Sequence, residues 1–315
     1  MPTLLADAQL TALVDSFNRQ DLPPASEIGV ARLRAAAEER AASRPKGPGM
    51  HEIRELSIPP HAIRARLYRP SPGPLPVVVY LHGGGWVIGD LETHDRACRR
   101  LAATSRAAVL AVDYRRAPEH PWPAAVEDAV ATLSWIASVP VDLNPQPSPI
   151  AIAGDSAGGT TAALTCLAVR GDRTLLPSLQ VLIYANTDLA ESGGSMRSKG
   201  HGFVLEASDI AWFNAQWVPG REMLSDPRVS PLRARHLAGL PATVVITCEH
   251  DPLRDQGEAY ARRLVDAGVP TTLRREEGMV HNFMLWDLIS PACAAAADRV
   301  AVDIGRALGS LSAIP

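Results

Sequence analysis

The sequence predicts an α/β fold with a mostly parallel central sheet that is covered by helices on both faces. Short, continuous apolar runs rich in β-branched residues recur along the 315-residue chain, and such runs are typical of strands buried on both faces. Helical stretches lie between most of these runs, and this alternation indicates a parallel sheet. A chain of this length can form one large domain or two smaller ones, and the pattern favours one domain with an insertion.

The elements are expected in the following order. Residues 3–20 and 25–42 place apolar side chains at helical spacing, so the chain is expected to begin with helices. Residues 51–58 and 62–69 alternate apolar and polar side chains, as half-exposed edge strands do. The parallel strands are expected at residues 76–81, 107–113, 150–154, 180–185 and 243–248, with helices near 93–106, 121–138, 156–170 and 255–267. A strand at 271–277 and an alanine-rich C-terminal helix complete the pattern.

Two local signals refine this division. The helix near 255–267 is expected to begin at Asp255, a good N-cap residue, and to end before Gly268, a good C′ residue. Residues 186–235 break the alternation and carry aromatic residues without a clear strand, so we interpret them as an insertion over the carboxyl end of the sheet. The predicted units are N-terminal cap helices (1–45), a cap insertion (186–235) and an α/β body (46–185 continued by 236–315).

The composition excludes several classes of protein. With 31 Lys and Arg against 34 Asp and Glu, the formal net charge is −3, which is not the charge of a nucleic-acid binder or a polybasic membrane binder. No apolar run exceeds six residues, so no membrane span is expected. The first residues do not resemble a secretory signal. Four widely spaced cysteines are expected as reduced, buried thiols, and the protein is expected to be cytoplasmic: Cys98, Cys166, Cys248 and Cys293.

The first motif with chemical content is GDSAGG at residues 154–159. It follows the apolar run IAIA and precedes a helical stretch, and a GxSxG sequence in that setting predicts a nucleophile elbow at Ser156. The tight turn requires glycine on both sides, and the helix that begins there directs its N–H groups at developing negative charge. The alternative is a glycine-rich turn with a capping serine. Asp155 is expected to make local hydrogen bonds.

The second motif is HGGGW at residues 82–86, which follows another buried strand. Three successive glycines leave backbone N–H groups free to face a ligand, as in the HGGG type of oxyanion loop. His82 is expected to hold the shape of this loop. A flexible loop or a phosphate-binding loop is the alternative, but neither GxxxxGK[ST] nor a GxGxxG motif before a helix is present.

With three further segments, these motifs resemble the hormone-sensitive-lipase-like family of bacterial carboxylesterases, which have the α/β-hydrolase fold. The resemblance extends over residues 77–310 or so, and its further segments are DYRRAPEHPWPAA (113–125), HDPLRDQGEAYARRL (250–264) and GMVHNF (278–283). In two places the chain departs from the family pattern. Arg116 replaces the usual leucine in a structural segment, and Asn186 replaces a small apolar residue near the expected floor of the pocket.

The resemblance implies a catalytic triad of Ser156 as nucleophile, Asp251 as acid and His281 as general base. It further implies that the oxyanion is bound by the backbone N–H groups of Gly84, Gly85 and Ala157. The order Ser–Asp–His along the chain is the one expected for this fold. No metal, nucleotide or redox cofactor is implied.

Without the resemblance, the histidine and the acid that would act with Ser156 can be chosen among several candidates only by their positions in the sequence. His281 lies just past the last predicted strand, whereas His250 adjoins Asp251, and neighbours in an extended segment usually point apart. Glu249 and Asp255 follow the same strand as Asp251. Asp255 is better explained as a helix cap, so we rank Asp251 first.

The predicted function is hydrolysis of short- to medium-chain acyl or aryl esters, with a small-molecule ester as partner. Amide hydrolysis, including deacetylation, or lactone hydrolysis by the same residues is the alternative. A further alternative is a non-catalytic receptor of the same fold. The receptor of this family, however, lacks the catalytic histidine, which this chain keeps as His281. A homodimer is compatible with the sequence. Candidate apolar lining of the pocket, with packing between cap and body as the alternative role, is Trp86, Phe203, Leu205, Trp212, Phe213 and Met284.

Overall fold

A computed structural model describes residues 5–20, 22–138 and 149–312 of the chain, so the outermost residues of the first and last predicted units lie outside it. Its central feature is an eight-stranded sheet in the order β1-β2-β4-β3-β5-β6-β7-β8. The strands from β3 to β8 pair in parallel, as predicted. The strands are β1 (Glu52–Ile58), β2 (Ile63–Arg69), β3 (Val77–Leu81), β4 (Ala108–Val112), β5 (Ile150–Asp155), β6 (Leu179–Ile183), β7 (Ala242–His250) and β8 (Thr271–Val280).

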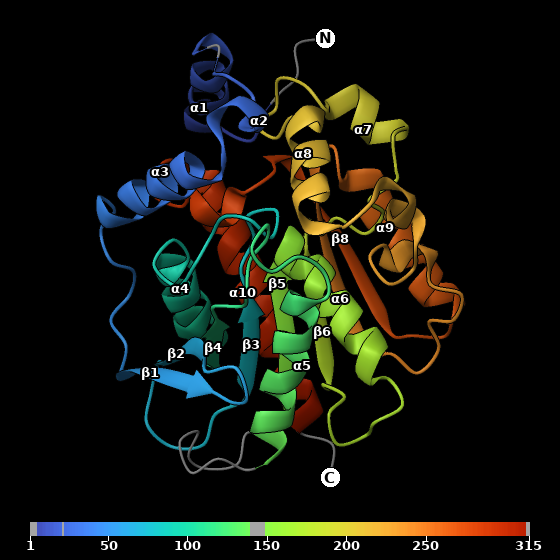
Figure 1. Cartoon of the computed structure of the whole chain (residues 1–315). Helices are drawn as coiled ribbons and strands as arrows, with labels where there is room; N and C mark the ends of the chain where they lie inside the picture. Colours follow the sequence, from blue (N-terminus) through green and yellow to red (C-terminus); the bar gives the residue numbers. More distant parts are fainter. Residues whose placement is uncertain (1–4, 21, 139–148, 313–315) are drawn as a thin grey trace.

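Helices cover both faces of this sheet (Figure 1). Alternate residues of one strand serve the two sides: Val79 belongs to the apolar cluster that includes helices α5, α6 and α9, whereas Val78 and Tyr80 belong to the cluster of α4 and α10. Because both faces are buried, the strands need apolar side chains in succession. The helices are α4 (Asp95–Ser105), α5 (Ala124–Ala137), α6 (Ala157–Val169), α9 (Arg254–Asp266) and α10 (Pro291–Ser312).

Two predicted details of the sheet and its helices are wrong. Strand β2 is not an edge strand, because it lies between β1 and β4 and is almost entirely buried. Helix α9 begins at Arg254, so Asp255 lies in its first turn and is not its N-cap. The Asp255 carboxylate instead accepts a hydrogen bond from the backbone N–H of Ser195, at 2.8 Å. Gly268, with φ of 76°, follows the helix as predicted.

The remaining helices come from the N-terminus and from residues 186–235. Figure 1 shows α1, α2, α7 and α8 together at one end of the molecule, above the sheet. The Asp209 carboxylate on α8 accepts a hydrogen bond from the backbone N–H of Ala25 on α2, at 2.9 Å, which joins the two segments. Residues 186–235, all described, contain no strand, as predicted. These helices are α1 (Ala8–Arg19), α2 (Ala25–Ile28), α3 (Val30–Ala42), α7 (Gly194–Lys199) and α8 (Ala207–Trp217), with short 3₁₀ turns at Arg221–Ser225 and Pro231–Arg233. A further 3₁₀ turn, Phe283–Leu285, follows β8.

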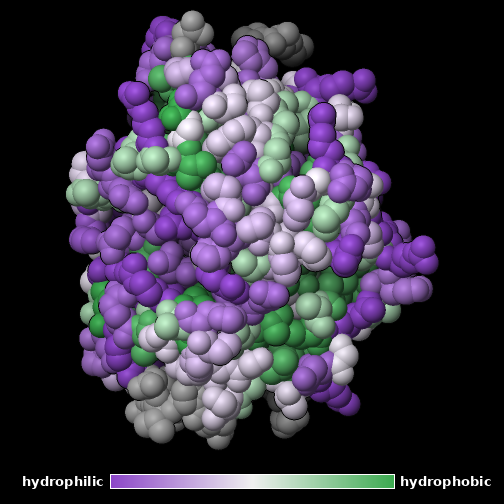
Figure 2. All heavy atoms as spheres, in the orientation of Figure 1, coloured by the Kyte–Doolittle hydropathy of each residue, from purple (hydrophilic) through white to green (hydrophobic). Residues whose placement is uncertain are grey.

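Two other predictions from composition can be compared with the fold. The four cysteines are buried and free, as predicted. Within the described residues no helix is both long and apolar enough to cross a bilayer. In Figure 2 the largest group of exposed hydrophobic residues on this face lies in its lower right part, over α5 and α6, and smaller groups lie elsewhere.

Candidate active site

Ser156 occupies a sharp turn between β5 and α6. Its backbone has φ 53° and ψ −120°, a conformation that is strained for any residue with a Cβ. The glycines around it are needed for space, because a Cβ on Gly158 would overlap the carbonyl oxygen of Leu81 and one on Gly154 would overlap the backbone of Gly158. The serine hydroxyl therefore projects from the end of β5 at the N-terminus of α6. The GxSxG motif lies in the strand–turn–helix setting that was predicted for it.

Ser156, His281 and Asp251 form a continuous hydrogen-bonded line. The Oγ atom of Ser156 lies 3.0 Å from Nε2 of His281, and Nδ1 of His281 lies 2.8 Å from Oδ2 of Asp251. Asp251 follows β7 and His281 follows β8, so the carboxyl ends of adjacent strands place them together. Both side chains are almost completely buried. The Oδ1 atom of Asp251 accepts a second hydrogen bond, from the backbone N–H of Leu253 at 2.8 Å, which fixes the carboxylate.

The competing histidine and acid of this region lie elsewhere. His250 stacks on Phe203, with ring centroids 5.2 Å apart, and its Nδ1 lies 3.2 Å from Nζ of Lys199. The Glu249 carboxylate accepts a hydrogen bond from the backbone N–H of Gly278 at 2.7 Å. His281 has a ring neighbour that the sequence reasoning missed: Tyr184, just after β6, packs against it at 4.6 Å between centroids.

The HGGGW loop lies against the elbow. Its first glycine N–H, that of Gly83, donates a hydrogen bond to Asp155 Oδ1 at 2.9 Å. Gly84 and Gly85 have positive φ angles of 116° and 60°, which side chains with a Cβ rarely adopt. Within the described part of the chain, the N–H groups of Gly84, Gly85 and Ala157 donate no hydrogen bond to another protein group. These three groups are therefore free to bind an anionic oxygen.

His82 supports this loop from a fully buried position. Its Nδ1 lies 2.8 Å from the carbonyl oxygen of Gly83 and its ring stacks on Tyr114, with centroids 4.2 Å apart. Burial, reinforced by the charge of His94, lowers the pKa of His82 to about 3. Neutral His82 therefore donates from Nδ1 to the loop carbonyl.

Two adjoining cavities open at the triad. The inner one, about 90 Å³, is lined by Ser156 and His281, and the outer one is about 360 Å³. They share Gly84, Ile88 and Asn282. The two cavities therefore adjoin, and a substrate bound at Ser156 lies beside the outer one.

The structure divides the six side chains predicted as pocket lining. Trp86, Leu205 and Phe213 line the inner cavity. The other three lie elsewhere, which corrects the prediction: Phe203 stacks on His250, and Trp212 packs edge-on against Phe213. Met284 is 3% exposed and belongs to the core around α10. The inner cavity also has lining that the prediction missed, which includes Ile88, Ile210, Asn214, Leu253 and Asn282.

The two departures from the family pattern have different places. Asn186 lines the inner cavity beside Ser156 and donates from Nδ2 to Oδ1 of Asn214 at 3.2 Å. Arg116 donates a hydrogen bond to the carbonyl oxygen of Gly89 at 2.6 Å. Asn186 therefore introduces an amide into the cavity wall, whereas Arg116 supports the loop after HGGGW. Among the described residues, no group of three or more His, Cys, Asp or Glu side chains could hold a metal ion.

Comparison with known proteins finds relatives that match most of the chain. Residues 78–285 match a family that is described by the α/β-hydrolase fold. The chain belongs to this family, in its hormone-sensitive-lipase-like branch. The family match spans the elbow, the HGGGW loop and the complete triad.

Among relatives of this α/β hydrolase are two proteins of Mycobacterium tuberculosis. It is 43% identical to the carboxylic ester hydrolase LipN over 76% of this chain and 66% of LipN, so the chain spans slightly less than two thirds of that relative. It is 42% identical to the carboxylesterase NlhH over 74% of each chain. A solved structure, the hyperthermophilic esterase of Pyrobaculum calidifontis, superposes with a TM-score of 0.87 at 38% identity, covering 95% of this chain and 98% of that one.

Proposed function

We propose that the protein is a serine carboxylesterase in which Ser156 is the nucleophile, His281 the general base and Asp251 the residue that orients the base. The observation that carries the proposal is the line of hydrogen bonds from Ser156 Oγ through His281 to Asp251, at 3.0 and 2.8 Å, beside an inner cavity of about 90 Å³. The names of the relatives LipN and NlhH support the same reaction class.

The reaction follows from this geometry in two halves. Nε2 of His281 takes the hydroxyl proton while Ser156 Oγ attacks the ester carbonyl carbon, and Asp251 stabilises the imidazolium that forms. The carbonyl oxygen becomes negative and accepts hydrogen bonds from the free N–H groups of Gly84, Gly85 and Ala157. Collapse of this intermediate releases the alcohol, which takes the proton from Nε2.

Water then attacks the acyl-enzyme in the same manner. His281 accepts a proton from the water, and the second tetrahedral intermediate collapses to the carboxylic acid and free Ser156. The N-terminus of α6 lies at the oxyanion position and adds favourable electrostatic potential. No step of this sequence requires a cofactor.

The cavities support esters with short to medium acyl chains or aryl alcohols as substrates. The inner cavity is small, and the ring of Phe213 and the side chains of Leu205 and Ile210 form apolar parts of its wall. Such a wall provides favourable burial for methylene groups, at about 0.8 kcal/mol for each, but leaves little room for a long chain. Amide and lactone hydrolysis use the same residues and stay alternatives.

The proposal is tested by measuring p-nitrophenyl acetate and butyrate hydrolysis by the wild type, Ser156→Ala and His281→Ala. We expect each variant to lose roughly 10³-fold or more of kcat, in line with serine hydrolases generally. An organophosphonate should add its mass at Ser156 of the wild type only. Equal hydrolysis by the wild type and Ser156→Ala, or none by either, would overturn the assignment.

Asp251→Asn separates the role of the acid from a structural one. If the single amide oxygen of the variant keeps the hydrogen bond from the Leu253 N–H, its NH2 group faces Nδ1 of His281 and cannot accept from it. The neutral amide also has no negative charge to stabilise the imidazolium. We expect kcat to fall roughly 10³- to 10⁴-fold with little change in thermal stability. A competition between a matched ester and anilide distinguishes esterase from amidase activity. The homodimer and the cytoplasmic location stay predictions, which size-exclusion chromatography and cell fractionation can test.

A further inference from the structure

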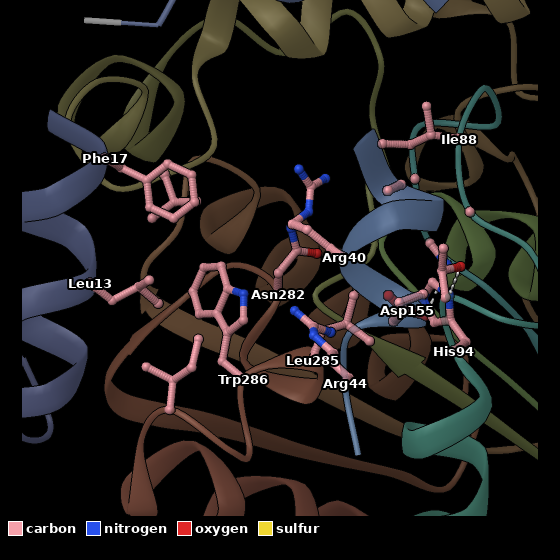
Figure 3. A pocket seen from close by; sticks show the side chains of 18 residues that line it. Leu13, Phe17, Arg40, Arg44, Ile88, His94, Asp155, Asn282, Leu285 and Trp286 are labelled. Carbon is pink, nitrogen blue, oxygen red and sulfur yellow. Dashed lines mark hydrogen bonds and ion pairs between the residues drawn. The ribbon is translucent and has the colours of Figure 1, made fainter. Parts of the chain in front are cut away.

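The outer cavity, about 360 Å³, is the larger of the two spaces beside the triad. Figure 3 shows its apolar wall, to which Leu13 and Phe17 contribute from α1 and Leu285 and Trp286 from the segment after β8. The N-terminal helices thus complete this cavity, and Gly84 lines both it and the inner one. Whatever part of a substrate does not fit at Ser156 has this space available.

Arg40, in the last turn of α3, and Arg44, two residues past the end of that helix, also line the cavity. Arg40 and Arg44 lie four residues apart and point into the space lined by Phe17 and Trp286 (Figure 3). Their guanidinium groups make no hydrogen bond or ion pair with a protein group in the described part of the chain. Arg34, on the same helix, is different: it binds the Glu119 carboxylate through both terminal nitrogens, at 2.8 and 2.7 Å.

The surroundings leave this positive charge without a partner. Burial and the charges of Arg40 and Arg96 lower the pKa of Arg44, while the nearby Asp287 opposes this effect. Asp287 is, however, already shared by Arg96 and Arg100, at 2.9 and 3.2 Å. Arg40 is exposed and Arg44 is partly buried. Like charges this close in the chain repel each other, so an anion bound beside both guanidinium groups would be stabilised by them.

The acidic residue at the other end of the cavity does not pair with the arginines. Asp155 is the one acidic residue among the described residues that line it. Its Oδ1 atom accepts hydrogen bonds from the Tyr80 hydroxyl and the Gly83 N–H, and lies 3.5 Å from Nε2 of His94. The apolar wall therefore ends in two guanidinium groups that are available to a ligand.

We propose that the outer cavity binds a carboxylate carried by the substrate, with Arg40 and Arg44 as the groups that recognise it. The inference rests on the proposed esterase function and names its substrate class: esters of which one arm, acyl or alcohol, has an apolar stretch that ends in a carboxylate. A guanidinium group binds a carboxylate through two parallel hydrogen bonds, and a second one nearby adds charge complementarity. Arg40 and Arg44 are thus specificity-determining residues and take no part in bond making.

The test compares matched esters that differ only in the charge at the end of one arm. For the acyl arm, mono-p-nitrophenyl adipate is compared with the p-nitrophenyl ester of its monoamide. For the alcohol arm, 3-(4-acetoxyphenyl)propionate is compared with its primary amide. Each is measured with the wild type, with the double variant Arg40→Gln/Arg44→Gln and with Arg32→Gln, an exposed arginine of the same helix that does not line the cavity.

We expect wild type to favour the anionic member of at least one pair in kcat/KM, mainly through a lower KM. The double variant should reduce this anionic-to-neutral ratio about fivefold or more, as loss of partly exposed ion pairs predicts, and Arg32→Gln should keep it. The ratio should also fall with added salt. Two outcomes would overturn this inference alone, provided that neutral esters are still hydrolysed. One is an anionic-to-neutral ratio that the double variant leaves unchanged, and the other is a wild type that prefers the anionic ester in neither pair. Hydrolysis of neither class would overturn the proposed function and this inference with it.

Discussion

Asp155, the residue before the proposed nucleophile, accepts a hydrogen bond from the backbone N–H of Gly83 at 2.9 Å. The same Oδ1 atom accepts the Tyr80 hydroxyl at 2.8 Å. These bonds join the elbow after β5 to the loop after β3, which are about 70 residues apart in sequence. Because Gly83 uses its N–H in this way, the N–H groups that stay available to an oxyanion are those of the next two glycines.

The first prediction follows from this link. Asp155→Ala leaves the Gly83 N–H and the Tyr80 hydroxyl without their acceptor in a fully buried position, and an unpaired buried donor costs about 1–3 kcal/mol. We expect the free energy of unfolding in urea to fall by about 3 kcal/mol or more. The kcat of ester hydrolysis should fall as well, because the oxyanion loop loses its attachment.

Asp155→Asn is the matched control, since its side-chain oxygen keeps both hydrogen bonds. It should retain more stability and more activity than Asp155→Ala. If the two variants proved equally stable and equally active, Asp155 would not act through the Gly83 N–H.

A second prediction concerns the close approach of the elbow to β3. Gly158→Ala would place a Cβ against the backbone carbonyl of Leu81, which cannot move without displacing the strand. We expect Gly158→Ala to be insoluble or to have a strongly lowered Tm. Gly309→Ala, in the exposed part of α10 with open space around it, should leave Tm unchanged or raise it slightly, because alanine favours a helix over glycine by about 1 kcal/mol. A well-folded and active Gly158→Ala enzyme would show that the elbow does not need glycine at this position.

The motifs could be predicted from sequence because their meaning is local. GxSxG in a strand–turn–helix setting marks a sharp turn by its own residues, although Gly158 also makes room for Leu81 of a neighbouring strand. β-branched runs indicate buried parallel strands wherever they occur. His281 and Asp251 were located by their positions after strands and by family resemblance, and the fold then brought them together. Such features depend little on how distant segments pack.

The cavity lining could not be predicted in the same way. Met284 and Phe213 are both large and apolar, so hydrophobicity alone does not distinguish core from cavity wall; Met284 is buried in the core, whereas Phe213 lines the inner cavity. The outcome depends on how α1 and α8 pack over the sheet. Likewise, Arg40 and Arg44 belong to the cavity only because α3 is folded back over it. Nothing within ten residues of either arginine indicates that position.

A third prediction concerns acid stability and His82. Its pKa is about 3 in the folded protein against 6.5 for an ordinary histidine, because burial disfavours the charged ring. Between these values the unfolded chain binds the proton more readily, so stability decreases as pH falls from 6.5 towards 3. The slope approaches 1.4 kcal/mol per pH unit for one proton. Carboxylates with lowered pKa values, such as Asp155, act in the same direction but only below about pH 4.

Urea unfolding at pH 6.5 and at about pH 5 therefore isolates the histidine contribution. Wild type should lose about 1.6 kcal/mol over this interval, because at pH 6.5 the unfolded histidine is already half protonated. His82→Asn should lose clearly less, although it starts from a lower stability, and His61→Asn, at an exposed position, should follow wild type. The same pH dependence in wild type and His82→Asn would mean that His82 does not carry it.

The last prediction concerns the size of the inner cavity. The ring of Phe213 lies directly against Gly85, where a Cβ would overlap it, and forms part of the cavity wall. Phe213→Ala removes this wall and makes room for several methylene groups, each worth about 0.8 kcal/mol when buried. We expect the kcat/KM ratio of a long to a short substrate to rise roughly tenfold. The ratio is measured in two series: p-nitrophenyl esters from acetate to octanoate, which lengthen the acyl arm, and alkyl acetates, which lengthen the alcohol arm. It should rise in the series whose arm occupies this cavity. The control is Trp212→Ala, because Trp212 packs on Phe213 without lining the cavity. It should change the ratio much less, since the cavity wall stays in place. If Phe213→Ala left the length preference unchanged in both series, the substrate would lie outside the inner cavity.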